Sequence, residues 1–301
     1  GFDRFSPAEL WGDSDRMVVS WGGVVVAAAL SRKIDPDKLR FRLVGAHTDS
    51  PNLRIKPNPD VGHLGYQQLG VEVYGGALLN SWLDRDLGLS GRVVVGDSAS
   101  HESHLIHIDK PLLRVAQLAI HLDRDVNDGL KLDRQAHLVP IWGLGETEEG
   151  AFRSFLATEL GVNDTEVLSW DMMCHDLTPS SPLGRNEEFY AAPRIDNLAS
   201  CHAALEALRD IESVASNTIS AVVLFDHEEI GSESSTGARG PMLSHALERI
   251  AGTRAVSREQ FLRSLSRSAC ISADGAHAVH PNYVDRHEPG HQVVLNGGPV
   301  I

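Results

Sequence analysis

Two adjacent glutamates, Glu228 and Glu229, stand two residues after an apolar stretch in the sequence LFDHEEIGS (Leu224–Ser232). Carboxylates that are crowded beside a buried strand repel one another, and this cost falls when they share a proton or a cation. In metal-dependent hydrolysis, one carboxylate binds the metal ion while a second takes a proton from a water molecule. The glutamate pair therefore indicates hydrolytic metal chemistry as one explanation of this stretch.

Three further places put ligand-type side chains at expected element boundaries. His47 follows the apolar run FRLVGA, Asp274 follows CISA, and Asp196 opens a helical stretch. Strand ends in an open α/β sheet gather along one edge, so these side chains converge if their strands are neighbours. A two-zinc hydrolytic site needs a carboxylate that bridges the metals, terminal His or carboxylate ligands, and one unligated carboxylate. Asp49 lies two residues after His47, on the same side of an extended chain, where it can orient the imidazole.

Each of these residues also has an ordinary explanation when it is taken alone. A His-Thr-Asp sequence is usually a polar turn, and a Glu-Glu pair is usually surface charge. Asp196 can be a first-turn acid favoured by the helix dipole, and Asp274 can close a turn with Gly275. Most of the fifteen histidines, His175 among them, are expected to be exposed or structural. A serine nucleophile and a phosphate loop have little support, because the sequence contains no GxSxG, GxGxxG or P-loop motif.

Composition argues against several other classes of function. The 301-residue chain has a net charge of −14, whereas nucleic acid and anionic membranes require a basic surface. The three cysteines are odd in number and form no CxxC pair, which argues against a disulfide framework and favours a reducing compartment. No apolar run reaches the length of a membrane span. We therefore expect a cytoplasmic protein without nucleic-acid or membrane partners, although the chain does not begin with Met and leaves a targeting segment open.

The elements that must position these residues are expected at both ends of the chain. Apolar, β-branched runs predict strands at Val18–Leu30, Phe41–His47, Thr218–Phe225 and Ser268–Asp274. Helical patterns are found at Glu146–Gly161, Arg194–Ile211 and Pro241–Ile250. A capping box at Ser257–Gln260 predicts the start of another helix.

The middle of the chain, from about Pro51 to Asn186, has a different pattern. Short strand candidates alternate with turn residues at Gly70–Tyr74, Arg92–Gly96 and Ala136–Trp142. The segment Thr178–Glu188 is rich in Pro, Ser and Gly and is predicted to be a linker. The fold class expected is therefore α/β: a mixed-sheet α/β/α domain that carries a mostly-β insertion.

Six motifs, spread in order over nearly the whole chain, resemble the aspartyl aminopeptidase family of dinuclear zinc metallopeptidases. They are VGAHTDSPNLRIKPNP (Val44–Pro59), LLRVAQLAIHLDRDVNDG (Leu112–Gly129), RIDNLAS (Arg194–Ser200), DHEEIGSESSTGA (Asp226–Ala238), ISADGAHAVHPNY (Ile271–Tyr283) and LNGGPVI (Leu295–Ile301). The length and order of these motifs make the resemblance specific. One difference is His227, where the family often has Asn, and we interpret it as a neutral variation.

The resemblance implies a role for each residue of the site. His47 is similar to a terminal zinc ligand, and Asp196 to the carboxylate that bridges two zinc ions. Glu229 resembles a ligand of one zinc and Asp274 a ligand of the other, while Glu228 resembles the general base. The implied cofactor is zinc, two ions per subunit, although His and carboxylate ligands also bind cobalt (Co2+) or manganese (Mn2+). The implied reaction removes an N-terminal Asp or Glu from peptides, using a water molecule held between the zinc ions.

The resemblance also implies how the chain is divided and how it assembles. Residues 1–50 and 189–301 correspond to the catalytic domain, and residues 51–188 to an inserted dimerisation domain. The implied assembly is a dodecamer built from dimers. The family continues beyond Ile301 with a lysine and, later, a further histidine ligand.

Two histidines outside the ligand set gain implied roles in the same way. His277 resembles a histidine that contacts substrate, and His121 one that the dimerisation domain carries toward a neighbouring active site. Arg54 and Lys56, close to His47 in sequence, are candidates for holding an acidic side chain. A dinuclear aminopeptidase with another residue preference and a non-catalytic scaffold or cargo homologue stay open as alternatives.

Overall fold

A computed structural model describes residues 1–301 of the chain. In this structure, the strand Thr218–Phe225 has the bounds that its apolar run predicts. The chain folds as two units. The terminal unit comprises Gly1–Ser50 and Arg194–Ile301, and the inserted unit comprises Pro51–Pro193. Each unit has its own sheet and its own hydrophobic core.

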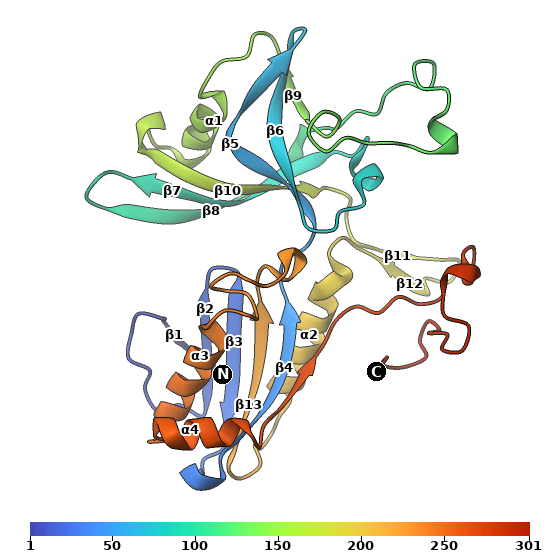
Figure 1. Ribbon diagram of the computed structural model, residues 1–301. Coiled ribbons are helices and arrows are strands. Elements are labelled where there is room, and N and C mark those ends of the chain that lie inside the picture. The colour runs from blue at the N-terminus through green and yellow to red at the C-terminus, as the bar shows by residue number, and fades with distance from the viewer. The chain divides into compact units, whose positions relative to one another are not determined.

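A six-stranded mixed sheet forms the centre of the terminal unit (Figure 1). Its strands, in spatial order, are β1 (Asp3–Phe5), β2 (Arg16–Trp21), β3 (Val24–Leu30), β13 (Thr218–Phe225), β4 (Arg40–His47) and β14 (Ala269–Ser272). Strand β13 is antiparallel to β3 and parallel to β4, and β14 is also parallel to β4. The carboxyl ends of β13, β4 and β14 therefore lie at the same edge of the sheet.

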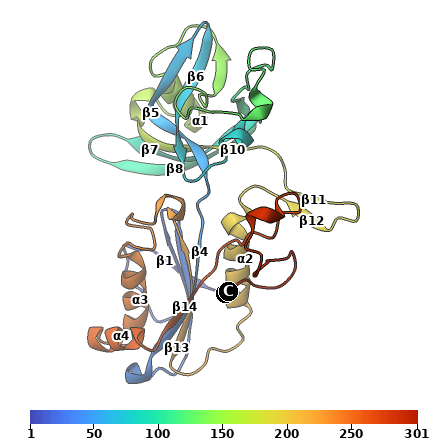
Figure 2. The same ribbon diagram turned by 45° about the vertical axis from the view of Figure 1, so that its right-hand side comes forward.

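Helices cover both faces of this sheet, with α2 on one face and α3 and α4 on the other (Figure 2). Their bounds are α2 (Ile195–Arg209), α3 (Met242–Gly252) and α4 (Arg258–Leu265). Because successive strand residues point to opposite faces, Ala27 and Ala29 of β3 share a buried cluster with Leu208 of α2. Val26 belongs instead to the cluster that contains Ile250 of α3. Both faces of β3 are thus buried, and the predicted α/β/α layers are confirmed.

Local signals explain how two of these helices begin. The N–H of Gln260 donates to Oγ of Ser257 at 3.3 Å, and the N–H of Ser257 donates to Oε1 of Gln260 at 3.0 Å, which confirms the predicted capping box. The first turn of α2 is irregular, because Arg194 is left-handed (φ 59°) and Asp196 and Asn197 have non-helical dihedral angles. The Asp196–Asn197 peptide bond is cis. A helix able to span a bilayer is absent from the structure.

A second six-stranded sheet, antiparallel throughout, forms the inserted unit. Its strands, in spatial order, are β8 (His101–Leu113), β7 (Leu87–Gly96), β10 (Val167–Asp176), β5 (Asn52–His63), β6 (Tyr66–Tyr74) and β9 (Ile141–Leu144). Helix α1 (Ala151–Leu160) contributes Phe152 and Leu156 to a core that includes Leu89. A small hairpin of β11 (Ser181–Leu183) and β12 (Phe189–Ala191) completes the unit. The predicted mostly-β insertion is therefore confirmed.

Three predicted elements of the inserted unit differ from the structure. The strand predicted at Ala136–Trp142 is wrong over its first part, because Oδ1 of Asp133 accepts two backbone N–H groups, each at 2.8 Å, and closes a turn there. The helix predicted at Glu146–Gly161 begins only after Gly150, whose φ of 87° is not helical. The predicted linker Thr178–Glu188 contains the first strand of the hairpin.

Candidate metal centre

Three predicted site segments lie at or just beyond the ends of β4, β13 and β14, whose carboxyl ends share one edge of the sheet. Phe225, the last residue of β13, pairs with His47, the last residue of β4. Strand β14 ends at Ser272 and runs beside β4 in the same direction. Glu228 and Asp274 lie just beyond β13 and β14, so both side chains reach the edge that His47 occupies, as their positions after strands predict.

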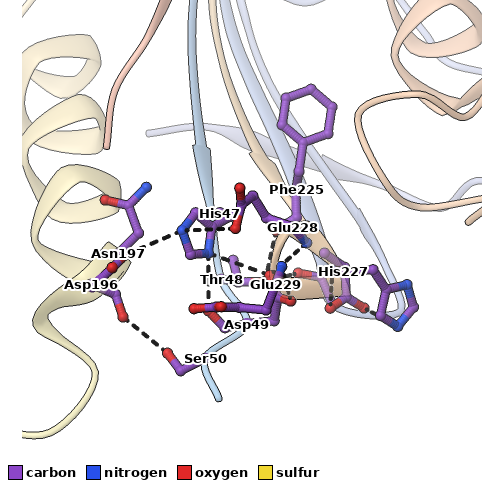
Figure 3. A network of polar contacts seen from close by, with 12 residues as sticks. His47, Thr48, Asp49, Ser50, Asp196, Asn197, Phe225, His227, Glu228 and Glu229 are labelled. Atoms are coloured by element: carbon purple, nitrogen blue, oxygen red, sulfur yellow. Dashed lines mark hydrogen bonds and ion pairs between the residues drawn. The ribbon is translucent and has the colours of Figure 1, made fainter. Parts of the chain in front are cut away.

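His47 is the centre of the cluster (Figure 3). Its side chain is only 5% exposed, and its Nε2 lies 3.3 Å from Oδ1 of Asp196, 3.6 Å from Oδ1 of Asp274 and 3.8 Å from Oε2 of Glu228. The ligand atoms form two groups, and within each group all atoms lie within 4.8 Å of one another. One group joins His47 to Glu228 and Glu229, and the other joins it to Asp196 and Asp274. The structure thus brings all five residues together.

Asp49 connects the histidine to the glutamate pair (Figure 3). Its backbone carbonyl accepts a hydrogen bond from Nδ1 of His47 at 3.0 Å, and its Oδ1 lies 3.4 Å from the same nitrogen. Its two carboxylate oxygens accept the N–H groups of Glu228 and Glu229, each at 3.1 Å. An imidazole that donates through Nδ1 presents the lone pair of Nε2 to a metal ion. Asp49 therefore orients the ring and holds the glutamate backbone beside it.

Two further polar residues, not predicted from the sequence, hold the irregular start of α2 at this edge. Oγ of Ser50 donates to the backbone carbonyl of Asp196 at 3.1 Å. Asn197 is 1% exposed, and its Nδ2 donates to the carbonyl of Ala273 at 2.9 Å. Their hydrogen-bond partners lie 146 and 76 residues away in the chain, so the sequence does not indicate these contacts. The one sequence feature that points to Ser50 and Asn197 is that each directly follows a predicted site residue.

Electrostatics at the cluster favour a cation. The carboxylates of Asp196, Glu228 and Asp274 all lie within ion-pair distance of the same group, the imidazole of His47. Three negative charges thus share one imidazole. Burial lowers the pKa of His47, but a hydrogen bond to a backbone carbonyl and the surrounding carboxylates outweigh this effect, so the net pKa shift is upward. Burial raises the pKa of Glu229, and the charges of Asp196 and Glu228 raise it further. Without a cation, His47 and Glu229 therefore hold their protons more tightly than the isolated side chains do.

The ligand set fits zinc. Imidazole nitrogen and carboxylate oxygen both bind Zn2+, at about 2.0–2.2 Å. The side chains of Asp196, Glu228 and Asp274 are 59%, 47% and 54% exposed, whereas the imidazole behind them is buried. The carboxylate side is therefore open to solvent, which leaves room for a further ligand on a bound metal ion.

The remaining predicted residues lie outside both ligand groups. His277 is exposed, in irregular chain after β14, and His121 is exposed in a turn of the inserted unit. Their proposed contacts with substrate stay predictions. Nδ1 of His227 forms a hydrogen bond with Oγ of Ser234 at 2.6 Å, and Nε2 of His227 lies 3.6 Å from Oδ2 of Asp226.

Comparison with known proteins identifies the family. The family profile described as "Aminopeptidase I zinc metalloprotease (M18)" matches residues 1–301. A Streptomyces avermitilis protein named "Probable M18 family aminopeptidase 2" is 49% identical over 306 residues, which cover 100% of this chain and 70% of that protein. A chain in the cryo-EM structure of the Ape4 and Nbr1 complex is 33% identical with a TM-score of 0.89, over 98% of this chain and 62% of that chain. The S. cerevisiae mApe1 dodecamer is 25% identical with a TM-score of 0.81, over 99% of this chain and 70% of its own. This chain therefore belongs to the M18 family of aminopeptidases, which are zinc metalloproteases.

Proposed function

We propose that this chain forms the catalytic site of a metal-dependent aminopeptidase that removes N-terminal Asp or Glu from peptides. The observation that carries the proposal is the convergence of four carboxylates on the buried imidazole of His47, in two ligand groups. The M18 match supports aminopeptidase activity. The preference for an acidic residue is supported by the six motifs that resemble aspartyl aminopeptidases.

The ligand groups suggest how two zinc ions would be held. His47, Asp196 and Asp274, whose ligand atoms lie within 4.8 Å of one another, would bind one ion. Asp196 would bridge to a second ion that Glu229 binds. When bound, zinc supplies Lewis-acid polarisation of the scissile carbonyl and makes a water molecule more acidic.

Glu228 is the proposed general base. Its side chain is 47% exposed and can approach a water molecule on the substrate side, while its backbone N–H is fixed on the carboxylate of Asp49. The carboxylate takes a proton from water as the water attacks the first peptide carbonyl. The same proton then goes to the amine of the departing peptide, which returns Glu228 to its starting state.

Recognition of the acidic side chain requires a local donor, because a chain of net charge −14 repels acids at long range. Arg54 and Lys56 already have acidic partners in the inserted unit: Nε of Arg54 lies 2.9 Å from Asp171, and Nζ of Lys56 lies 3.8 Å from Glu72. His277, exposed and close in sequence to β14, is the residue that we propose for substrate contact.

We further propose that residues 51–188, which fall within the inserted unit, form a dimerisation domain of a dodecamer. The similarity to the S. cerevisiae mApe1 dodecamer supports this assembly. His121 is exposed on that unit, where it is accessible to a neighbouring subunit.

A substrate panel tests the proposed function. The full-length protein is stripped of metal, reloaded with zinc and assayed on chromogenic amides of Asp, Leu and Ala. Zinc-dependent turnover that favours the Asp amide is expected. Turnover that favours the Leu amide would support the metallo-aminopeptidase activity and contradict the proposed preference for acidic residues. The absence of turnover on all three amides, with zinc bound, would favour a non-catalytic scaffold.

A further inference from the structure

A second group of metal-ligand side chains lies on the inserted unit and shares no residue with the proposed metal centre of the terminal unit. His107 and Asp109 belong to β8 and His175 to β10, and their ligand atoms all lie within 4.8 Å of one another. Strand β7 lies between these two strands (Figure 1). The group therefore spans three adjacent strands of one sheet.

The register of the sheet explains how the group forms. Ser90 of β7 pairs with His107 on one side, and Gly88 pairs with His175 on the other. Residues two apart in a strand share a face, so both histidines and Asp109 project from the same face. A Cβ atom added at Gly88 would lie 2.7 Å from Nε2 of His175 and 2.4 Å from the carbonyl oxygen of Ile108. The absence of a side chain at Gly88 thus leaves the space that the imidazole occupies.

His175 is the preorganised member of the group. The residue is 8% exposed, and its Nδ1 lies 3.2 Å from Oγ of Ser90. Its ring stacks on that of His107, with centroids 4.9 Å apart and planes 18° apart. Because the hydroxyl engages Nδ1, the orientation of the ring is set, and Nε2 faces Gly88.

We propose that His107, Asp109 and His175 bind one divalent transition-metal ion of the zinc class. Two imidazoles and a carboxylate are a ligand set that zinc accepts, with bonds of about 2.0–2.2 Å. His107 and Asp109 are exposed, and they reach these bond lengths by rotating their side chains while His175 stays fixed. The neighbouring Cys174 is not a ligand, because it packs in the core, where burial raises its pKa to about 12.

The bound ion would link β8, at the edge of the sheet, to β10 across β7. The three ligands come together only when the strands have paired. Zinc therefore binds the folded sheet in preference to the unfolded chain and stabilises the inserted unit.

The first test counts zinc per chain, by equilibrium dialysis and elemental analysis of the full-length protein. His107→Gln and Asp109→Asn change exposed residues, and each variant is expected to bind one zinc ion fewer than the wild type. His104→Gln is the matched control, because His104 is on β8 but projects from the opposite face, and it should retain the full zinc content. Ser90→Ala should weaken zinc binding at this group by about 10–100-fold, because it removes the partner that orients His175.

A second test separates this group from the M18 site. Asp196→Ala removes the proposed bridging ligand there, and in that variant zinc should still raise the midpoint of thermal unfolding. The addition of His107→Gln should abolish the rise. Equal zinc content in the wild type, His107→Gln and Asp109→Asn would overturn the proposal, and so would a zinc-dependent rise that survives His107→Gln.

Discussion

Replacement of Asp49 by Asn tests whether this residue holds the histidine and the glutamate pair together. Its two carboxylate oxygens accept the N–H groups of Glu228 and Glu229, each at 3.1 Å, and its Oδ1 lies 3.4 Å from Nδ1 of His47. An amide has only one oxygen, so its NH2 group would face one of the two N–H donors. The substitution therefore removes one hydrogen bond and the negative charge beside the imidazole, with almost no change in volume.

The magnitude follows from these contacts. Asp49 is only 9% exposed, so solvent does little to replace what is lost. A hydrogen bond to a charged group contributes about 1.5–3 kcal/mol, and about 1.4 kcal/mol corresponds to a factor of ten. If this loss is transmitted to the ligands, zinc affinity falls by roughly 10- to 150-fold, which agrees with the range of about 10–100-fold for groups that orient metal ligands.

Calorimetric titration of the metal-free protein with zinc measures this change, and kcat/KM should fall with it at limiting zinc. Asp133→Asn is the matched control, because Asp133 also accepts two backbone N–H groups, each at 2.8 Å, in a turn of the inserted unit. That variant should keep the affinity of the wild type. A folded Asp49→Asn protein that binds zinc as tightly as the wild type would refute the role given to Asp49.

Three further substitutions test the assigned roles. Glu228→Gln should keep its zinc in elemental analysis while kcat falls about 10²–10⁴-fold, because an amide cannot take the proton, and an unchanged kcat would remove the assignment as base. Asp196→Ala should lose zinc, so full zinc content would contradict its role as the bridging ligand. Glu229→Gln tests the raised pKa of Glu229 in metal-free protein. Because the pKa is raised on folding, the carboxyl group of Glu229 loses its proton at a lower pH, near 4.5, in the unfolded state than in the folded state. The free energy of unfolding of the wild type should therefore fall relative to Glu229→Gln as pH rises through the folded-state pKa, and parallel urea-unfolding curves against pH in chelator would contradict the shift.

The convergence of His47, Glu228 and Asp274 could be predicted because each residue follows an apolar run that forms a strand. Parallel strands end at the same edge, so three separate segments of sequence imply one site. The hydrogen bonds of Asp49 could not be predicted in this way, because its acceptor oxygens meet N–H groups 179 and 180 residues later in the chain. The irregular start of α2 around Asp196 also lacks a signal, because helical periodicity describes the regular turns and not the residues before them.

The second ligand group was missed for a different reason. Alternation along β10 indicates which residues share a face with His175, but the strand order and the register decide that His107 lies near it. A glycine in a strand does not show from the sequence which side chain occupies the space beside it. The packing of His175 against Gly88 therefore becomes visible only in the structure. The sequence interpretation of His175 as an exposed or structural histidine therefore used only the local sequence pattern, without knowledge of how the strands pair.

The proposed metal centre is tested most directly by anomalous X-ray diffraction at the zinc absorption edge, from crystals of the zinc-loaded full-length protein. An anomalous peak is expected within bonding distance of Nε2 of His47 and of carboxylate oxygens of Asp196 and Asp274. A second peak is expected beside Asp196 and Glu229. Zinc-loaded crystals without a peak beside Nε2 of His47 would contradict the claim that this edge of the sheet is a metal centre.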